Sequence, residues 1–294
     1  MQIAVELAGV TCKFIYHVLD TVGSCWHWKL DPYKLSDIRE CDLLVNLTAK
    51  DSNKEDFSRE NCLVFTQSTG FFQHQIFFHQ DNKTIWKYVR NRSEKLYLNY
   101  KINPEWNQIS LLDDNTQSAG FLAFEYIGQI IPGVLLKHNI LTFHGVLMEY
   151  HGQGIIISAK SGTGKTTHAR LWRDFNQALI INGDRSTVCI KNGVWMGFGL
   201  PWSGTSGEQI NRSVPVKALV VLERNEQNEA HCITGLEAFG AVFPHLQYPI
   251  WDKKMAIQAI SNLEQFLSVI PIIRLSCRPD LEGVSVLKKV LEKL

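Results

Sequence analysis

The sequence predicts an α/β domain built on a mixed sheet over residues 115–294, preceded by a β-rich region over residues 1–114. The second part of the chain alternates short apolar runs, typical of buried strands, with apolar residues at three- and four-residue steps, typical of helices. Between one such run and one such helical pattern lies a glycine-rich segment, AKSGTGKTT at residues 159–167. The first part holds short apolar or aromatic runs separated by polar clusters, which indicates strands.

Whole-chain composition narrows the class of protein. The 294 residues include 30 Lys and Arg against 29 Asp and Glu, so neither a nucleic acid nor a membrane is expected as partner. The first 20 residues lack the features of a signal peptide, and no apolar run has the ~18 residues of a membrane helix. The 7 cysteines include no Cys-x-x-Cys pair, which favours free thiols in the cytoplasm over disulfides or a zinc site.

The segments that lead to the glycine-rich loop are a helix and a hairpin. Apolar residues at helical steps over residues 118–136 predict a helix that Pro132 kinks or ends. Residues 141–150 and 154–158 then predict two strands joined by a tight turn at residues 151–153. The second strand therefore runs directly into the loop.

The segments after the loop continue the alternation. Asn192-Gly193 marks a hairpin, and residues 199–213 are expected to form an exposed loop. We expect helices at residues 166–173, 236–243, 253–267 and 281–294, and strands at residues 178–181, 186–190, 194–198, 217–222 and 271–275.

The glycine-rich loop matches the P-loop pattern and predicts nucleoside-triphosphate binding. Gly162 and Gly164 leave room for backbone N–H groups to turn towards phosphate oxygens. Lys165 is expected to reach the β- and γ-phosphates of ATP and Thr166 to bind Mg²⁺. Ala159 stands where the pattern has its first glycine, which requires a negative φ there. The nucleotide-binding residues expected are Ser161, Gly162, Thr163, Gly164, Lys165, Thr166 and Thr167.

Asp184 is the first candidate for catalysis. It follows the apolar run ALII at residues 178–181, so it is expected at the carboxyl end of a strand, where ligands of α/β sheets bind. Its carboxylate could hold Mg²⁺, accept the proton of an attacking hydroxyl, or do both. The alternative is that Asp184 caps a turn or pairs with Arg185.

His144 and Arg212 are the other candidates. If the hairpin turns at Gly152, paired residue numbers sum to about 304, which sets His144 opposite Lys160 at the start of the loop. His144 could contact phosphate, assist proton transfer, or be structural. Arg212, in the 199–213 loop, could stabilise charge on a transferring phosphoryl group. Trp202 in the same loop could pack on the sheet or touch substrate.

Several of these motifs resemble a known family. The run HGVL at residues 144–147, the segment SGTGKT at residues 161–166 and the pair Asp184-Arg185 resemble HPr kinase/phosphorylase and its relatives, whose P-loop domain is akin to phosphoenolpyruvate carboxykinase. THARLWR at residues 167–173 and LPWSG at residues 200–204 resemble an HPr-kinase-like subgroup. That subgroup includes kinases from lasso-peptide gene clusters, which phosphorylate a C-terminal serine of a precursor peptide.

The resemblance implies ATP- and Mg²⁺-dependent phosphoryl transfer to a serine hydroxyl, with Asp184 as base or metal ligand and His144 in support. Two departures limit it. The family often has paired acids where this chain has Gly183-Asp184, and the second glycine-rich signature of the bifunctional enzymes is not recognisable after Glu223. Phosphorylase activity and HPr itself as substrate are therefore not expected.

The leading hypothesis is a cytoplasmic kinase acting on a serine of a peptide or small protein. A partner protein that senses ATP without transferring phosphate is a second hypothesis, because one acid must serve two roles. A small-molecule kinase is a third, since a fold does not define the acceptor. The oligomeric state stays open, a homo-oligomer included.

Overall fold

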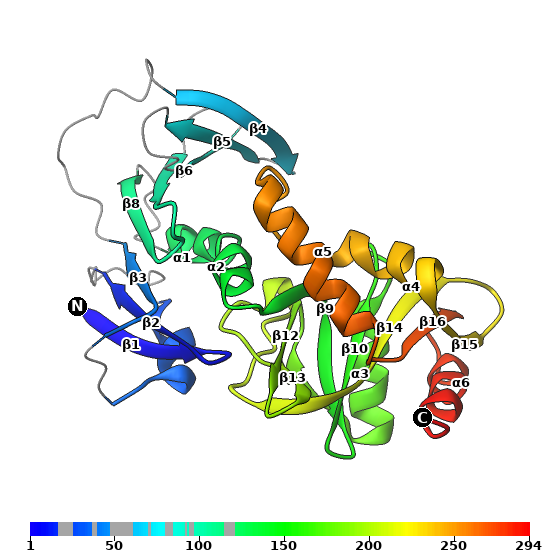
Figure 1. Cartoon of the computed structure of the whole chain (residues 1–294). Coiled ribbons are helices and arrows are strands. Elements are labelled where there is room, and N and C mark those ends of the chain that lie inside the picture. The colour runs from blue at the N-terminus through cyan, green and yellow to red at the C-terminus, as the bar shows by residue number, and fades with distance from the viewer. Residues whose placement is uncertain are drawn as a thin grey trace. The chain divides into compact units, whose positions relative to one another are not determined.

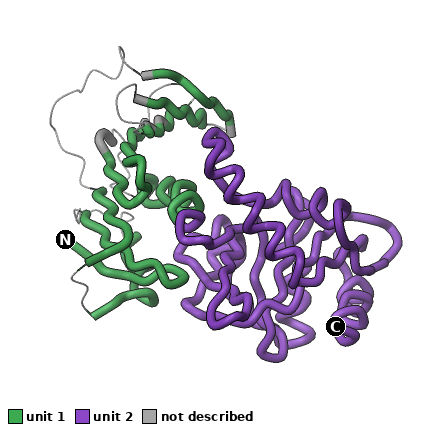
Figure 2. The backbone as a smooth tube through the Cα atoms, viewed as in Figure 1, with its two compact units in different colours: residues 1–134 green, residues 135–294 purple. Residues whose placement is uncertain are grey.

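The computed structural model divides into two compact units, Met1–Val134 and Leu135–Leu294 (Figure 2). The residues it describes are 1–16, 26–36, 40–47, 61–69, 72–79, 85–91, 93, 97–114 and 121–294. The boundary expected between residues 114 and 115 stays a prediction, because residues 115–120 lie outside the described part of the chain. The expected mixture of helices and mixed sheets is confirmed.

The described residues of unit 1 form one eight-stranded sheet in the order β1-β2-β3-β8-β7-β6-β5-β4. β2–β3 and β3–β8 are parallel pairs and the other neighbours are antiparallel, so this sheet is mixed. Its strands are β1 (Gln2–Leu7), β2 (Val10–Ile15), β3 (Leu43–Asn46), β4 (Asn61–Thr69), β5 (Phe72–His79), β6 (Ile85–Asn91), β7 (Tyr97–Ile102) and β8 (Gln108–Asp114), and the short helix η1 (His27–Tyr33) follows β2.

The helical stretch after β8 is broken before its proline. α1 spans Phe121–Ile127 and α2 spans Ile131–Lys137, so Pro132 is the second residue of α2. A proline in the first turn of a helix removes no hydrogen bond, because the N–H groups there have no partner within the helix. The expected helix is thus interrupted in the turn before Pro132, in line with the expectation that this proline kinks or ends it, and Pro132 itself lies in the first turn of the second helix.

Unit 2 contains the glycine-rich loop and a second mixed sheet (Figure 1). Its strands are β9 (Leu141–Tyr150), β10 (Gln153–Ser158), β11 (Leu179–Asn182), β12 (Arg185–Lys191), β13 (Val194–Phe198), β14 (Ser213–Arg224), β15 (Glu229–Ile233) and β16 (Ile272–Cys277). Its helices are α3 (Lys165–Asn176), η2 (Gly204–Ser206), α4 (Gly235–Val242), η3 (Phe243–His245), α5 (Lys253–Leu267) and α6 (Leu281–Leu291). β15 was not predicted, and each expected strand and helix of this unit is present within a few residues.

The pairings of the second sheet bring the ends of its parallel strands to one edge. β10 is parallel to β14, and β14 is parallel to β16. β9, β12, β13, β14 and β10 pair in turn, and the β10–β14 contact closes these five strands into a ring. Because ligands of α/β sheets bind beyond the carboxyl ends of parallel strands, the segments after β10, β14 and β16 form the edge of interest.

The two faces of β9 pack against different helices. Val146 and Met148 belong to a buried cluster with Ala169 and Trp172 of α3. Phe143, on the opposite face, has its ring centroid 5.3 Å from that of Phe266 in α5. Successive side chains of a strand alternate between faces. Even-numbered positions of β9, His144 among them, therefore lie on the face that α3 covers.

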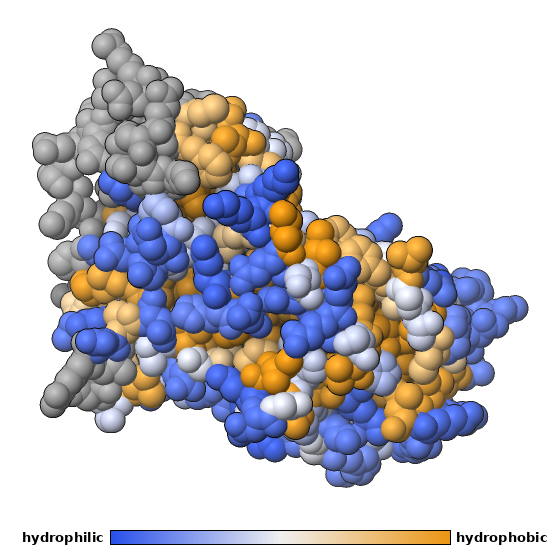
Figure 3. Space-filling view, in the orientation of Figure 1, coloured by the Kyte–Doolittle hydropathy of each residue, from blue (hydrophilic) through white to orange (hydrophobic). Residues whose placement is uncertain are grey.

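Thiols and surface residues complete this picture. Six cysteines are free, as expected, and Cys25 lies outside the described residues. Within the described residues, no helix has the length and apolar character needed to span a membrane. Figure 3 shows apolar residues over α4 and α5 interspersed with hydrophilic ones, and exposed apolar side chains of this region include Leu236, Ile250 and Ile257.

His168 lies in the core of unit 2 as a neutral ring. It is 1% exposed and accepts a hydrogen bond at Nε2 from Trp172 Nε1, 3.2 Å away. Burial lowers its pKa from 6.5 to about 4, and the charge of Asp280 opposes this only in part. An unfolded chain therefore binds more protons at this position than the folded one when the pH lies between those values.

We expect His168→Gln to reduce the acid sensitivity of folding. As pH falls from 6.5 to 5, protonation of the unfolded chain at His168 lowers the free energy of unfolding by about 2 kcal/mol. Glutamine does not titrate and can still accept from Trp172. Urea unfolding at pH 7 and pH 5 measures the difference, with the exposed His231→Gln as control. Equal pH dependence of His168→Gln and the unsubstituted protein would contradict this assignment.

Candidate functional site

The glycine-rich loop joins β10 to α3. Gly162 and Gly164 have φ of +77° and +118°, a region that side chains disfavour, so both positions require glycine. Ala159 is buried and does not adopt a positive φ, which meets the condition expected of a non-glycine residue there. The loop therefore delivers Lys165 as the first residue of α3.

Lys165, His144 and Asp184 form a chain of polar contacts. Lys165 Nζ lies 2.9 Å from His144 Nε2, and His144 Nδ1 lies 3.4 Å from Asp184 Oδ1. An ammonium group only donates, so Nε2 accepts and Nδ1 carries the proton that faces the carboxylate. Lys165 Nζ also donates to Ala159 O at 3.0 Å. The three side chains that the sequence singled out are thus brought together.

The hairpin register places His144 one residue away from the expected position. Gln153 pairs with Tyr150 and Ser158 with Gly145, so partner numbers sum to 303 and not 304. The difference arises because the turn has two residues, His151 and Gly152, both with positive φ. The expected pairing of His144 with Lys160 was therefore wrong, although the side chain still lies beside the start of the loop.

The backbone around Asp184 is held by Asn182, which sequence reasoning missed. Asn182 Oδ1 accepts from the N–H groups of Asp184 and Arg185, at 3.0 and 2.8 Å. Its Nδ2 donates to the carbonyls of Leu200 and Trp202, at 2.9 and 3.1 Å. Asn182 is fully buried and ties the turn before Asp184 to the 199–213 loop. A polar residue closing an apolar run was the one signal for it.

Gly183 and Gly204 show why this site has a single acid. A Cβ at Gly183 would lie 2.0 Å from Ser206 Oγ, and one at Gly204 would lie 2.7 Å from Asp184 Cγ. The η2 turn therefore packs directly against residues 183 and 184. The place that a second acid would take at position 183 is filled by Ser206.

Charges around Asp184 favour its ionised form. Burial is the largest influence and raises its pKa, but the hydrogen bond from His144 and the charges of Arg185 and Lys165 together bring the pKa below the usual 3.8. Arg185 Nε lies 3.5 Å from Asp184 Oδ2. Burial lowers the pKa of Lys165, and Asp184 opposes that shift. Asp184 is therefore a carboxylate at neutral pH.

Arg224 holds the outer side of the glycine-rich loop. From the end of β14, its Nε donates to Thr163 O at 2.9 Å and its Nη2 to Gly162 O at 2.8 Å. These contacts turn two consecutive carbonyls outward and leave the opposite side of the loop to its N–H groups. No sequence pattern identified Arg224, because the contact joins segments about 60 residues apart.

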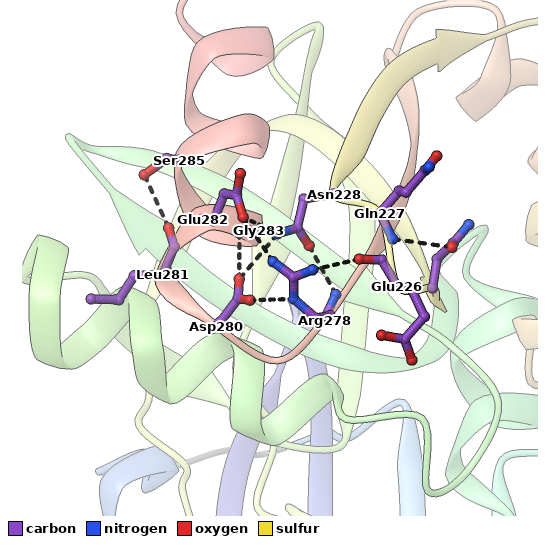
Figure 4. A network of polar contacts seen from close by, with 10 residues as sticks. Glu226, Gln227, Asn228, Arg278, Asp280, Leu281, Glu282, Gly283 and Ser285 are labelled. Carbon is purple, nitrogen blue, oxygen red and sulfur yellow. Dashed lines mark hydrogen bonds and ion pairs between the residues drawn. The ribbon is translucent and has the colours of Figure 1, made fainter.

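A second network fixes the neighbouring strand ends (Figure 4). Arg278, after β16, donates to Asp280 Oδ2 and Glu282 Oε2, both at 2.8 Å, and to Glu226 O at 2.6 Å. Asn228 Oδ1 accepts from the Arg278 N–H at 2.9 Å. The turn after β14 is thereby joined to the first turn of α6, next to Arg224.

Arg212 lies apart from these groups. It pairs through Nε and Nη2 with both carboxylate oxygens of Glu149. Glu149 pairs with Gly154 at the start of β10, whereas His144 lies near the end of that strand. The structure does not bring Arg212 to Lys165, and its expected role stays a prediction.

The 199–213 loop is only partly exposed, contrary to expectation. Residues 200–203 are buried, and Asn182 donates to the carbonyls of Leu200 and Trp202. Trp202 is fully buried, which favours packing over substrate contact. Glu208 Oε1 accepts from Arg173 Nη1 at 2.7 Å, and its carbonyl accepts from Gly183 N at 3.0 Å. The loop is thus docked between α3 and β11.

The remaining nucleotide-binding candidates lie at the start of α3 and on its loop. Thr163 and Thr166 are half-buried, and Ser161 and Thr167 are exposed. No group of three or more His, Cys, Asp or Glu side chains within the described residues is arranged to hold a metal ion. The hydroxyl of Thr166 and the carboxylate of Asp184 are oxygen donors of the kind Mg²⁺ takes when substrate phosphates and waters complete its ligands.

The candidate site lies within a segment of the chain that matches the model of a known family. The model of a family described as "SynChlorMet cassette protein ScmC" matches residues 110–277, more than half of the chain. No curated protein matches. A solved structure titled "Structure of the Hpr(Ser) kinase/phosphatase from Coxiella burnetii" is 12% identical, with a TM-score of 0.32, over 52% of this chain and 91% of that chain. The family match includes the site residues from His144 to Arg224 described above, and it ends one residue before Arg278.

We expect Gly183→Ala to be destabilising, because the added methyl group meets Ser206. Forcing atoms into such a packed position costs about 1–3 kcal/mol in the free energy of unfolding. Ser206→Gly should recover much of that loss in the double variant, which urea unfolding of all four proteins measures. Gly240→Ala in α4, where a Cβ meets nothing within 4 Å, is the matched control. Additive effects of Gly183→Ala and Ser206→Gly would contradict the contact.

Proposed function

We propose that this chain, which belongs to the family described as SynChlorMet cassette protein ScmC, transfers the γ-phosphate of ATP to a serine hydroxyl of a peptide or small protein. The observation that carries the proposal is the Lys165–His144–Asp184 chain at the mouth of the glycine-rich loop. A lysine for phosphate, a carboxylate for proton removal and a loop of N–H groups are the parts that phosphoryl transfer needs.

Phosphate binding is assigned to the loop and the start of α3. The N–H groups of residues 161–167 and the positive end of the helix favour an anion at this position. Lys165 now donates to Ala159 O and His144, so it exchanges these contacts for phosphate oxygens when ATP binds. Its lowered pKa reflects burial that an anionic ligand would offset.

Proton removal is assigned to Asp184. The acceptor oxygen forms a bond to the γ-phosphorus as the bond from that phosphorus to the bridging oxygen breaks, and the hydroxyl proton moves to Asp184. His144 donates from Nδ1 to the same carboxylate and holds its orientation, which makes His144 a positioning residue in this scheme. Once Lys165 turns to phosphate, Nε2 of His144 loses its donor and must take up a proton before it can donate to a phosphoryl oxygen.

Mg²⁺ fits the available donors. Thr166 and Asp184 would hold it together with phosphate oxygens, and the ion would neutralise charge on the β- and γ-phosphates. Because one carboxylate then serves metal and proton, the single acid beside Gly183 is the main constraint on rate. If one carboxylate does not serve both roles, the rival function follows: a partner protein that binds ATP and transfers no phosphate.

The acceptor is proposed from the sequence resemblance. A serine of a peptide, a lasso-peptide precursor among the candidates, is favoured over a metabolite because the resemblance extends to the peptide-kinase subgroup. The rival metabolite acceptor is tested in the same experiment. Cytoplasmic location and independence from nucleic acid are part of this proposal.

The proposal is tested by incubating the protein with ATP labelled in the γ-phosphate, Mg²⁺, and a peptide library with serine at varied positions. We expect labelled phosphoserine, and we expect Lys165→Ala and Asp184→Asn to lower the rate by about 10²–10⁴-fold. Lys191→Ala and Asp174→Asn, at exposed positions, are the matched controls. ATP binding without transfer to any peptide, metabolite or water would support the sensing protein instead.

We expect Arg224→Gln to raise the KM for ATP about tenfold with little change in kcat, because two charge-assisted contacts to the loop are lost. Arg224→Lys should give an intermediate KM, since an ammonium can reach one carbonyl. Steady-state kinetics in ATP measures both variants. An unchanged KM in Arg224→Gln would show that the loop holds its shape without this contact.

The variant Arg212→Gln tests whether Arg212, unlike Arg224, lies outside the reaction. With Arg212 bound to Glu149, we expect its kcat to stay within about twofold of the unsubstituted protein, as is usual for an exposed ion pair. A fall in kcat by tenfold or more would instead support the charge-stabilising role expected from the sequence.

A further inference from the structure

A second histidine, His245, lies next to His144 and has no part in the scheme above. It ends η3, and the following residue, Leu246, pairs antiparallel with Phe143 of β9. Gln247 N then donates to Thr142 O at 2.8 Å. This short segment lies along the edge of β9 that β10 leaves free after Ser158. One residue before the Phe143–Leu246 pair, His245 lies close to His144, which follows Phe143.

The register sets His144 between two neighbours on one face of the sheet. Residues directly opposite in an antiparallel pair project to the same side. On one edge of β9, Arg185 of β12 pairs with His144. On the other edge, His245 ends η3 one residue before the pair that Leu246 forms with Phe143. Lys165 enters from α3 on the face of β9 that α3 covers.

The ring of His245 is available to a ligand. The residue is 9% exposed, and no hydrogen bond joins its ring to a described residue. Neither ring nitrogen is fully buried without a partner, so the ring keeps an edge open to solvent. A neutral imidazole has one N–H donor, which can bind an acceptor that enters at this edge.

The surroundings of His245 select the ligand. Burial, followed by the charges of Lys165 and Lys160, lowers the pKa of His245 to about 4, so its ring is neutral at pH 7. A neutral ring presents an N–H donor where nearby cations already favour an anion. An oxygen of a phosphoryl group accepts from such a donor and is attracted to Lys165 and Lys160 at the same time.

We propose that His245 donates a hydrogen bond to an oxygen of the γ-phosphoryl group and is a catalytic residue of the transfer. This inference rests on the proposed function and adds a contact that forms on the phosphoryl group itself. His245 keeps its proton throughout. The bond that breaks, the bond that forms and the proton that moves to Asp184 are those already given.

The test compares His245→Leu, His245→Gln and the unsubstituted protein, with His231→Gln as a matched exposed control. Calorimetry gives the affinity for ATP and for ADP, and γ-phosphate release or transfer gives kcat. Removing one donor to a transferring group costs about 10²-fold in kcat. We therefore expect that loss in His245→Leu, a smaller one in His245→Gln, whose amide can still donate, and a lower ATP-to-ADP affinity ratio in His245→Leu.

The ADP affinity distinguishes this role from a structural one. A variant that merely disturbs the fold would weaken ADP and ATP alike, whereas loss of a γ-phosphoryl contact leaves ADP binding unchanged. Wild-type kcat and affinity ratio in His245→Leu would overturn the inference, as would a parallel loss of ADP and ATP affinity. If the unsubstituted protein neither binds nor uses ATP, the proposed function fails first, and the inference fails with it.

Discussion

The contact between Lys165 and His144 is the interaction on which the rest of the candidate site depends. It joins Nζ of Lys165, the first residue of α3, to Nε2 of His144 in β9, 2.9 Å away. His144 in turn contacts Asp184 through Nδ1. Without it, a cationic lysine at a buried position would face its own loop carbonyls alone. With it, the imidazole ring of His144 links Lys165 to Asp184, and each of the three groups changes the electrostatic environment of the others.

The arrangement follows from simple features of strands. Alternation along β9 sends Phe143 to α5 and His144 to α3, and a two-residue turn brings β10 back so that its end meets His144. The parallel run of β10 and β14 then places Arg224 against the loop that β10 feeds. Local rules of sheet geometry therefore gather groups that lie about 20–60 residues apart in the chain.

Much of unit 2 could be predicted because its elements carry strong local signals. The apolar runs, Asn192-Gly193 and the glycine-rich loop predicted the strands, a hairpin and the start of α3. The loop pattern identified Lys165, and the apolar run at residues 178–181 identified Asp184. The register of the first hairpin was off by one, since its turn length depends on the dihedral angles of His151. Asn182, Arg224 and His245 could not be found, because each acts through contacts with distant segments that no periodicity reports. Arg212 has the positive charge that its expected role needs, but its guanidinium pairs with the carboxylate of Glu149.

The close packing of Ser206 on Gly183 also bears on how such a site changes over generations. A second carboxylate introduced at position 183 by one substitution would meet the side chain of Ser206, which already fills that space. A smaller residue at 206 would have to come first, and by itself it offers no evident gain. The packing of one neighbouring side chain thus limits which residues position 183 accepts, apart from the chemistry that a second acid would bring.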